Sequence, residues 1–218
     1  ARQPRHRGEE VARQRGLHQR AERARFVLQL LHARRWRGVL GRPTWLTDLA
    51  SLGYFTYYAI PLALFVALYR RRPEAFPGAR FAVVFTFLLS FLGYFCLPAL
   101  GPRVPAEEAS AVLGGGPASA ALRSFLLRAE MNTYDAFPSG HTALSLTYLR
   151  LGWPNFPAWR AAFAAAVAAV IFSTVYLSLH YVIDLVAGAA LAAIAPAVGT
   201  RVERWLTPGG THADLLAR

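Results

Sequence analysis

Two ionisable side chains, His180 and Asp184, lie four residues apart at one end of an apolar stretch. On a helix, residues four apart share one face, so the carboxylate is within reach of the imidazole. A carboxylate that accepts the proton of one ring nitrogen fixes the tautomer and presents the other nitrogen as a nucleophile or a base. Ionisable groups in a membrane segment are a functional hypothesis by default, although such a pair can also be structural and satisfy only itself.

A second histidine lies in the segment Pro138-Ser139-Gly140-His141-Thr142. Pro138 and Ser139 are typical of a helix start, and Gly140 allows a ligand to approach the backbone closely. His141 then falls in the first turn, where backbone N–H groups and the positive end of the helix dipole form an anion site. The alternative is a capped helix that carries an interfacial histidine.

Arg103 lies at the start of the loop after the second apolar stretch. Its planar guanidinium suits phosphate oxygens, although a lone Arg after a helix is also a common headgroup anchor. Together, these groups supply what phosphoryl transfer through a covalent intermediate needs. One histidine attacks phosphorus, a cation and N–H groups stabilise the phosphate oxygens, and the other histidine protonates the leaving oxygen. This chemistry requires no metal and no cofactor.

The elements that must position these groups are apolar helices. The chain has 218 residues, of which 55% are hydrophobic and 17% charged, and its single Cys96 excludes an internal disulfide. A soluble domain is normally about a quarter charged. The composition therefore predicts an all-α integral membrane bundle, since crossing a bilayer takes about 20 largely apolar residues. The predicted spans are residues 49–69, 81–100, 136–153, 161–179 and 181–200.

Arginine placement predicts the orientation of this bundle. The loop 101–137 has three Arg against four carboxylates, whereas the connections on the opposite face are rich in Arg. By the positive-inside rule, the loop and the candidate site lie outside the cytoplasm. We expect a bacterial inner membrane protein whose site faces the periplasm or the exterior. The Arg residues of the predicted cytoplasmic face are Arg70, Arg71, Arg72, Arg80, Arg150, Arg160, Arg201 and Arg204.

The N-terminal 44 residues form a basic arm with twelve Arg and three Glu, which five spans would place on the external face. The explanations left open are a span upstream of Ala1, a weak crossing near 26–40, or an interfacial helix along anionic headgroups. Lipid contact is favoured over nucleic acid binding, because the arm adjoins a membrane domain. The expected organisation is this arm (1–44), a transmembrane catalytic domain (45–206) and a C-terminal tail (207–218).

The loop 101–137 is expected to shape the substrate site, because it lies over the span ends that carry the polar groups. The three glycines at 114–116 predict a break in the chain. Residues 117–130 then place apolar side chains on one helical face. This pattern predicts a helix lying in the membrane interface or, equally, an ordinary packed loop helix.

The motifs resemble those of the type 2 phosphatidic acid phosphatase (PAP2) superfamily. Its pattern is an Arg-containing first motif, a PSGH second motif and an S-R-x5-H-x3-D third motif. Residues 138–142 match the second motif in full. The third motif has Thr174 where Arg is usual, followed by His180 and Asp184 at the family spacing. The family bundle usually has six spans.

The first motif departs further, since Cys96 takes the place of Lys and Arg103 is followed by Val104. The stretch 172–188, FSTVYLSLHYVIDLVAG, is similar to the branch of the fungal inositol phosphorylceramide synthases, which also have S-T-x-Y-L before the His and D-L-x-A-G after it. Thr174 removes a phosphate ligand that hydrolases of the superfamily usually have. The similarity of the third motif therefore favours transfer, and the full PSGHT favours hydrolysis.

The resemblance implies a role for each candidate residue. His180 is then the nucleophile that becomes phosphohistidine, Asp184 orients it, and His141 is the general acid. The residues implied to hold the phosphate are Arg103, Ser139 and Gly140.

The expected function is that of a metal-independent lipid-phosphate phosphatase or phosphotransferase at the non-cytoplasmic face. Water as acceptor gives a phosphatase, and an alcohol acceptor gives a headgroup transferase of the inositol phosphorylceramide synthase kind. The expected partners are the bilayer, a lipid phosphate or phospholipid and, for transfer, the alcohol. A transporter is disfavoured, since it predicts polar groups near mid-bilayer and an internal repeat. An inactive member of the fold is disfavoured by the intact His141, His180 and Asp184.

Overall fold

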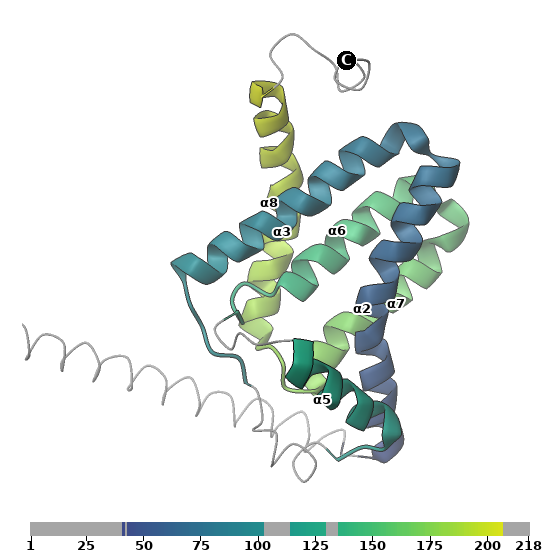
Figure 1. Cartoon of the computed structure of the whole chain (residues 1–218), viewed down its shortest axis with the longest axis vertical. Coiled ribbons are helices and arrows are strands. Elements are labelled where there is room, and N and C mark those ends of the chain that lie inside the picture. The colour runs from purple at the N-terminus through teal and green to yellow at the C-terminus, as the bar shows by residue number, and fades with distance from the viewer. Residues whose placement is uncertain (1–40, 42, 103–113, 130–134, 207–218) are drawn as a thin grey trace, which may run out of the picture. The chain divides into compact units, whose positions relative to one another are not determined.

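The structure is a computed structural model that describes residue 41 and residues 43–102, 114–129 and 135–206. The chain divides into two compact units, and the second, Arg42–Arg218, contains all the helices of the described ranges. Regular structure in these ranges is helical (Figure 1), which confirms the predicted all-α class. The helices are α2 (Thr44–Arg71), α3 (Phe76–Cys96), α5 (Pro117–Ala129), α6 (Gly140–Asn155), α7 (Arg160–Tyr176) and α8 (Val182–Leu206), with short 3-10 turns at Pro73–Ala75 and Pro157–Trp159.

Each predicted span corresponds to one of these helices. Within the part of the chain that the structure describes, three segments are long and apolar enough to cross a membrane: Thr44–Arg71, Pro73–Cys96 and Pro157–Tyr176. At 1.5 Å per residue, the 20 residues of the last segment extend for about 30 Å, the thickness of the hydrocarbon core. The other two predicted spans are shorter where they are apolar, since α6 has 16 residues and the apolar part of α8 is Val182–Ala195.

Large apolar side chains cover the outward faces of α2 and α3. A surface of this kind is costly in water and suits hydrocarbon. The large apolar residues with at least two fifths of their surface exposed on these two helices are Trp45, Leu49, Leu52, Tyr58, Leu62, Val66, Tyr69, Val84, Phe87, Leu88, Phe91, Leu92 and Phe95.

The central helix of the described bundle is α6, which contacts α2, α3, α7 and α8 (Figure 1). Its Leu144 and Tyr148 are buried in an apolar cluster with side chains of α2 and α7. Between membrane helices, small residues and interhelical hydrogen bonds add to this packing. The hydroxyl of Thr147 of α6 lies 3.4 Å from the hydroxyl of Thr86 of α3, oxygen to oxygen.

The loop helix α5 is anchored to α2 at its first turn. Gly115 has a φ of +99°, a left-handed conformation that favours glycine. The Asp48 carboxylate of α2 then accepts hydrogen bonds from Gly116 N, at 2.8 Å, and from Ser119 N, at 3.0 Å. Asp48 therefore caps a helix other than its own. The helix predicted within 117–130 is confirmed, and its Leu122 is buried in a cluster with Tyr54.

Candidate active site

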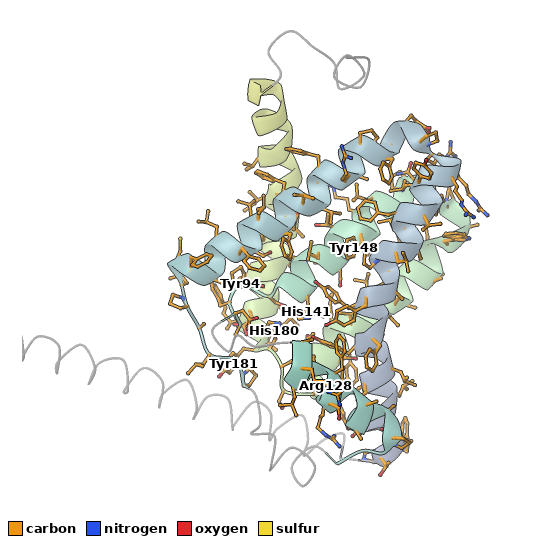
Figure 2. The ribbon with its side chains drawn as sticks, viewed as in Figure 1. Tyr94, Arg128, His141, Tyr148, His180 and Tyr181 are labelled. Carbon is orange, nitrogen blue, oxygen red and sulfur yellow. The ribbon has the colours of Figure 1, made fainter. Side chains whose placement is uncertain are left out.

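The two histidines of the candidate site meet where α6 begins and where α7 passes into α8 (Figure 2). Nδ1 of His141 lies 3.1 Å from Nε2 of His180, although 39 residues separate them along the chain. His180 is buried, with 6% of its surface exposed, and His141 is half-buried. The fold thus brings together the two imidazoles that the sequence singled out.

A tight helix end holds the backbone of His180. Helix α7 ends at Tyr176, and Ser178 then adopts a left-handed conformation with φ of +59°. The carbonyl of Thr174 accepts hydrogen bonds from Leu179 N, at 2.8 Å, and from His180 N, at 3.0 Å. This left-handed cap turns the chain back on itself and directs the His180 side chain toward α6.

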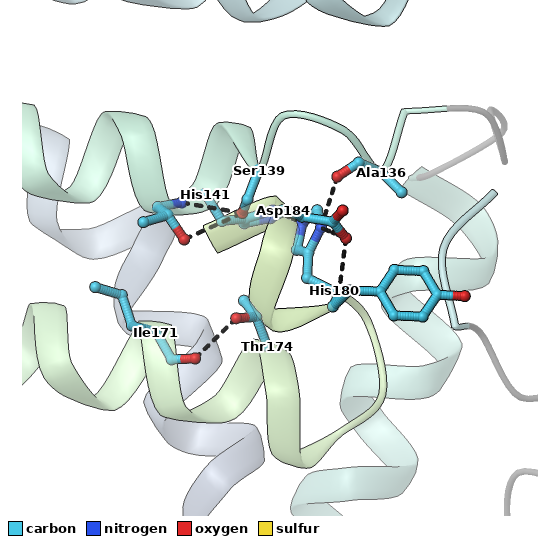
Figure 3. A network of polar contacts seen from close by, with 9 residues as sticks. Ala136, Ser139, His141, Ile171, Thr174, His180 and Asp184 are labelled. Atoms are coloured by element: carbon cyan, nitrogen blue, oxygen red, sulfur yellow. Dashed lines mark hydrogen bonds and ion pairs between the residues drawn. The ribbon is translucent and has the colours of Figure 1, made fainter. Parts of the chain in front are cut away.

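The second nitrogen of His180 faces a backbone carbonyl. Nδ1 lies 3.0 Å from Ala136 O and 3.6 Å from Asp184 Oδ2 (Figure 3). The first distance is a hydrogen bond, and the second is too long for one. Because a carbonyl oxygen can only accept, Nδ1 carries the proton, and in the neutral ring Nε2 keeps its lone pair. The sequence predicted Asp184 beside His180, but it did not predict the carbonyl of Ala136.

Asp184 holds the start of α8. Its Oδ2 accepts a hydrogen bond of 2.7 Å from Tyr181 N, and its own N–H donates to Tyr181 O at 3.1 Å. The carboxylate therefore lies at the positive end of the α8 dipole, which favours a negative charge. With 2% of its surface exposed, it places an anionic group directly behind the His180 ring.

Ser139 caps α6. Its Oγ accepts hydrogen bonds from Thr142 N, at 3.3 Å, and from Thr142 Oγ1, at 3.2 Å. Its own N–H donates to Asp184 O at 2.9 Å, which ties the start of α6 to α8. The capped helix considered from the sequence is therefore present, and the Ser139 hydroxyl still has a proton to donate.

At two glycines of the site, atoms of other segments pack so closely that a side chain would not fit. A Cβ on Gly188 of α8 would collide with the Ser139 carbonyl oxygen, and one on Gly140 would collide with the Tyr94 hydroxyl. Gly140 also contributes an N–H of the first turn of α6, which has no carbonyl partner within an α-helix. The Tyr94 hydroxyl of α3 therefore lies close to the start of α6, where the sequence predicted an anion site.

Thr174 is turned away from the histidines. Its side chain is fully buried, and its Oγ1 donates to Ile171 O of the same helix at 2.8 Å (Figure 3). Cys96, the other departure from the family pattern, is exposed at the last residue of α3. Arg103 lies outside the described residues. Among those described, no group of three or more His, Cys, Asp and Glu side chains could hold a metal ion.

Tyrosines of α2 pack around His141, and the sequence patterns considered above did not single them out. The Tyr54 hydroxyl lies 2.7 Å from His141 Nε2, and Tyr54 is fully buried. The ring centroids of Tyr54 and Tyr57 lie 5.1 and 4.5 Å from that of His141. A signal was available, since tyrosines three residues apart lie on one face of a span that is otherwise apolar.

The fold is that of a helical membrane protein. Its candidate site is a pair of partly buried histidines, one at the start of α6 and one in the turn between α7 and α8. The profile of the PAP2 superfamily matches residues 23–198, so the chain belongs to that superfamily. Its members are generally phosphatases and phosphotransferases, and membership together with the long apolar helices makes this chain an integral membrane protein. Comparisons with curated proteins and with solved structures gave no significant match.

Proposed function

We propose that the protein transfers a phosphoryl group from a membrane lipid phosphate through a phosphohistidine on Nε2 of His180. One observation carries the proposal: the two imidazoles face each other nitrogen to nitrogen, and Nδ1 of His180 is bonded to Ala136 O. The nitrogen that faces His141 is therefore the nucleophilic one. Asp184 supports this role, because a carboxylate behind the ring stabilises the positive charge that grows on it during attack.

In the first step, the lone pair of His180 Nε2 forms a bond to phosphorus and the ester P–O bond breaks. His141 gives its Nδ1 proton to the departing oxygen. In the second step, water or an alcohol attacks phosphorus, the N–P bond breaks and His141 takes up the proton of the acceptor. The Ser139 hydroxyl, the Gly140 N–H and Arg103 are the proposed ligands of the phosphate oxygens.

The proposed substrate is a lipid, because the candidate site lies within a bundle whose outer surface is apolar. Tyr54, which reaches the site, lies 16 residues before Arg70, about 24 Å along α2 from its arginine end at 1.5 Å per residue. Because the hydrocarbon core is about 30 Å thick, this position is near the opposite membrane face, where lipid headgroups carry their phosphates. The proposed face is the non-cytoplasmic one, because Arg70 and Arg71 mark the opposite end of α2.

The acceptor in the second step can be water, which makes the protein a phosphatase, or an alcohol, which makes it a transferase. The FSTVYLSLHYVIDLVAG stretch and the intrahelical bond of Thr174 favour transfer over hydrolysis, since Thr174 does not replace the phosphate ligand of hydrolases. The purified protein, given a lipid phosphate with and without inositol, would release inorganic phosphate as a phosphatase. A transferase would instead form inositol monophosphate, because the phosphoryl group leaves its lipid behind in the first step and gains one ester bond to inositol in the second.

Covalent trapping tests the mechanism. With a lipid carrying labelled phosphate, we expect label on the protein that survives alkali and is lost in acid, as an N–P bond requires. His180→Ala should abolish both the label and turnover. His141→Ala should lower turnover by about 10²- to 10⁴-fold, the usual contribution of a general acid.

The matched control is His212→Ala, which removes a histidine of the C-terminal tail and should retain wild-type turnover. Full turnover by His180→Ala, or a label on the protein that is stable in acid, would contradict the phosphohistidine. A wild-type protein that neither releases nor transfers phosphate from any lipid phosphate would contradict the function itself.

A further inference from the structure

The hydroxyl of Tyr54 makes a short polar contact to the nitrogen of His141 that faces away from His180. It lies 2.7 Å from His141 Nε2, and no part of Tyr54 is exposed. Its ring is held in place by Tyr58, with centroids 6.3 Å apart, and by the buried cluster that includes Leu122 of α5. A buried hydroxyl in so fixed a position needs a partner, and His141 supplies one.

The three rings form a chain of hydrogen bonds, and the carbonyl at one end of the chain favours one arrangement of the protons. Ala136 O accepts from Nδ1 of His180, so Nε2 of His180 is an acceptor. His141 Nδ1, 3.1 Å away, must then be the donor to it. In the neutral ring this leaves His141 Nε2 without a proton, and the Tyr54 hydroxyl donates to it.

We propose that Tyr54 is a positioning residue that holds the His141 ring with Nδ1, the nitrogen that carries the reactive proton, facing His180. This inference rests on the proposed function, and it adds a residue of α2 to a site otherwise built from α6, α8 and the α7–α8 turn. The hydroxyl serves both states of the ring. It donates to Nε2 of the neutral imidazole and, after rotation of its O–H bond, accepts from Nε2–H of the imidazolium.

The role follows from the proton balance of the first step. An imidazolium at His141 gives the Nδ1 proton to the leaving oxygen and becomes the neutral Nε2–H tautomer. The Tyr54 oxygen accepts from Nε2–H before and after this transfer. In the second step Nδ1 takes the proton of the acceptor, and the ring returns to its starting state with the same partner.

The first test is Tyr54→Phe, which removes one oxygen and keeps the ring. Losing a hydrogen bond to a charged group should lower kcat by about 10- to 100-fold for an alkyl ester phosphate and leave KM almost unchanged. With a nitrophenyl phosphate, whose leaving oxygen needs no proton, the loss should nearly disappear. The matched control is Tyr69→Phe on the same helix, where the residue is 69% exposed. It should behave as wild type with both substrates.

Equal losses with the two substrates would show a purely structural role and overturn the proposal. A wild-type protein without phosphatase or transferase activity would contradict the proposed function. The role of Tyr54 would then be tested by a second measurement that does not depend on activity. That measurement is nitrogen NMR of ¹⁵N-histidine protein at alkaline pH, where imidazoles are neutral. We expect His141 as the Nδ1–H tautomer in the wild type, because His180 Nε2 accepts its proton. In Tyr54→Phe the unprotonated Nε2 of His141 should shift in its ¹⁵N resonance, because it loses the hydrogen bond from the hydroxyl. An Nε2–H tautomer in the wild type would overturn the proposal whatever the activity.

Discussion

Thr174 is the residue at which the chain departs most clearly from the third motif of its superfamily, and the structure gives the side chain a local partner. Its hydroxyl donates to Ile171 O, whereas its carbonyl accepts from the N–H groups of Leu179 and His180. The backbone of this residue therefore positions His180, and its side chain does not face the histidines. Any residue type that keeps α7 helical could supply that carbonyl.

The variant Thr174→Val tests this division between side chain and backbone. It should cost about 1 kcal/mol for one neutral hydrogen bond and leave kcat/KM close to wild type. Ser139→Ala is the comparison, since loss of its cap costs about the same. If Ser139 holds the phosphate, this variant should also lose about 10- to 100-fold in kcat/KM. A comparable loss in Thr174→Val, measured on the same lipid phosphate, would show that its side chain serves the substrate.

Much of the site could be predicted because its residues have recognisable types and spacings. His141, His180 and Asp184 were singled out in this way, and the structure places them close together. The carbonyl of Ala136 could not be found, because every residue has a carbonyl and only the fold aims this one at His180. The spacing of Tyr54 and Tyr57 could have marked this face of α2, but no local pattern links Tyr54 to His141, which lies 87 residues away.

The crossing of α6 and α8 is the junction between elements on which the site depends. Ser139 N donates to Asp184 O, and Gly188 lets the Ser139 carbonyl pack directly against α8. This contact fixes the start of α6 relative to the α7–α8 turn, and so fixes His141 relative to His180. A shift of about 1 Å in such a constellation can cost about 100-fold in rate.

Replacing Gly188 by Ala should therefore lower both stability and turnover. Its Cβ would meet a backbone oxygen, which cannot rotate away, and overpacking of this kind costs about 1–3 kcal/mol. Gly78→Ala in α3 is the matched control, because no atom lies within 4 Å of its added Cβ. It should raise stability by about 0.5–1 kcal/mol, as Ala does in place of Gly within a helix. Thermal unfolding in detergent would distinguish the two, and a Gly188→Ala protein as stable and active as wild type would contradict the argument.

The helices themselves were predictable from apolar stretches, and their ends less so. The apolar stretch 49–69 correctly predicted a helix. The helix is longer than this stretch, since it runs from Thr44 to Arg71 and continues through Pro61. Hydropathy does not detect the polar turns at the ends of a helix. These turns are nevertheless helical, because they continue the hydrogen bonding of the helix. The anchoring of α5 by Asp48 was also hidden, since the capping carboxylate lies 68 residues before Gly116.

For the whole molecule, charge and apolar surface define an axis across the membrane. Arg70 and Arg71 end α2, and α3 then returns over 21 residues to Cys96. At 1.5 Å per residue this return covers about 30 Å, the thickness of the hydrocarbon core. We therefore expect Cys96 and the arginines to lie at opposite membrane faces. Under the positive-inside rule we expect the face of Cys96 to be the non-cytoplasmic one.

Because Cys96 is the single cysteine of the chain and is exposed, it can report this orientation directly. In right-side-out membrane vesicles, a maleimide that cannot cross the bilayer should label it without permeabilisation. The control is the double variant Cys96→Ser with Arg72→Cys, which moves the thiol to the exposed turn between α2 and α3. It should be labelled only after permeabilisation. The reverse pattern would place Cys96 in the cytoplasm, and the proposed enzyme would then act on lipid phosphates of the inner leaflet.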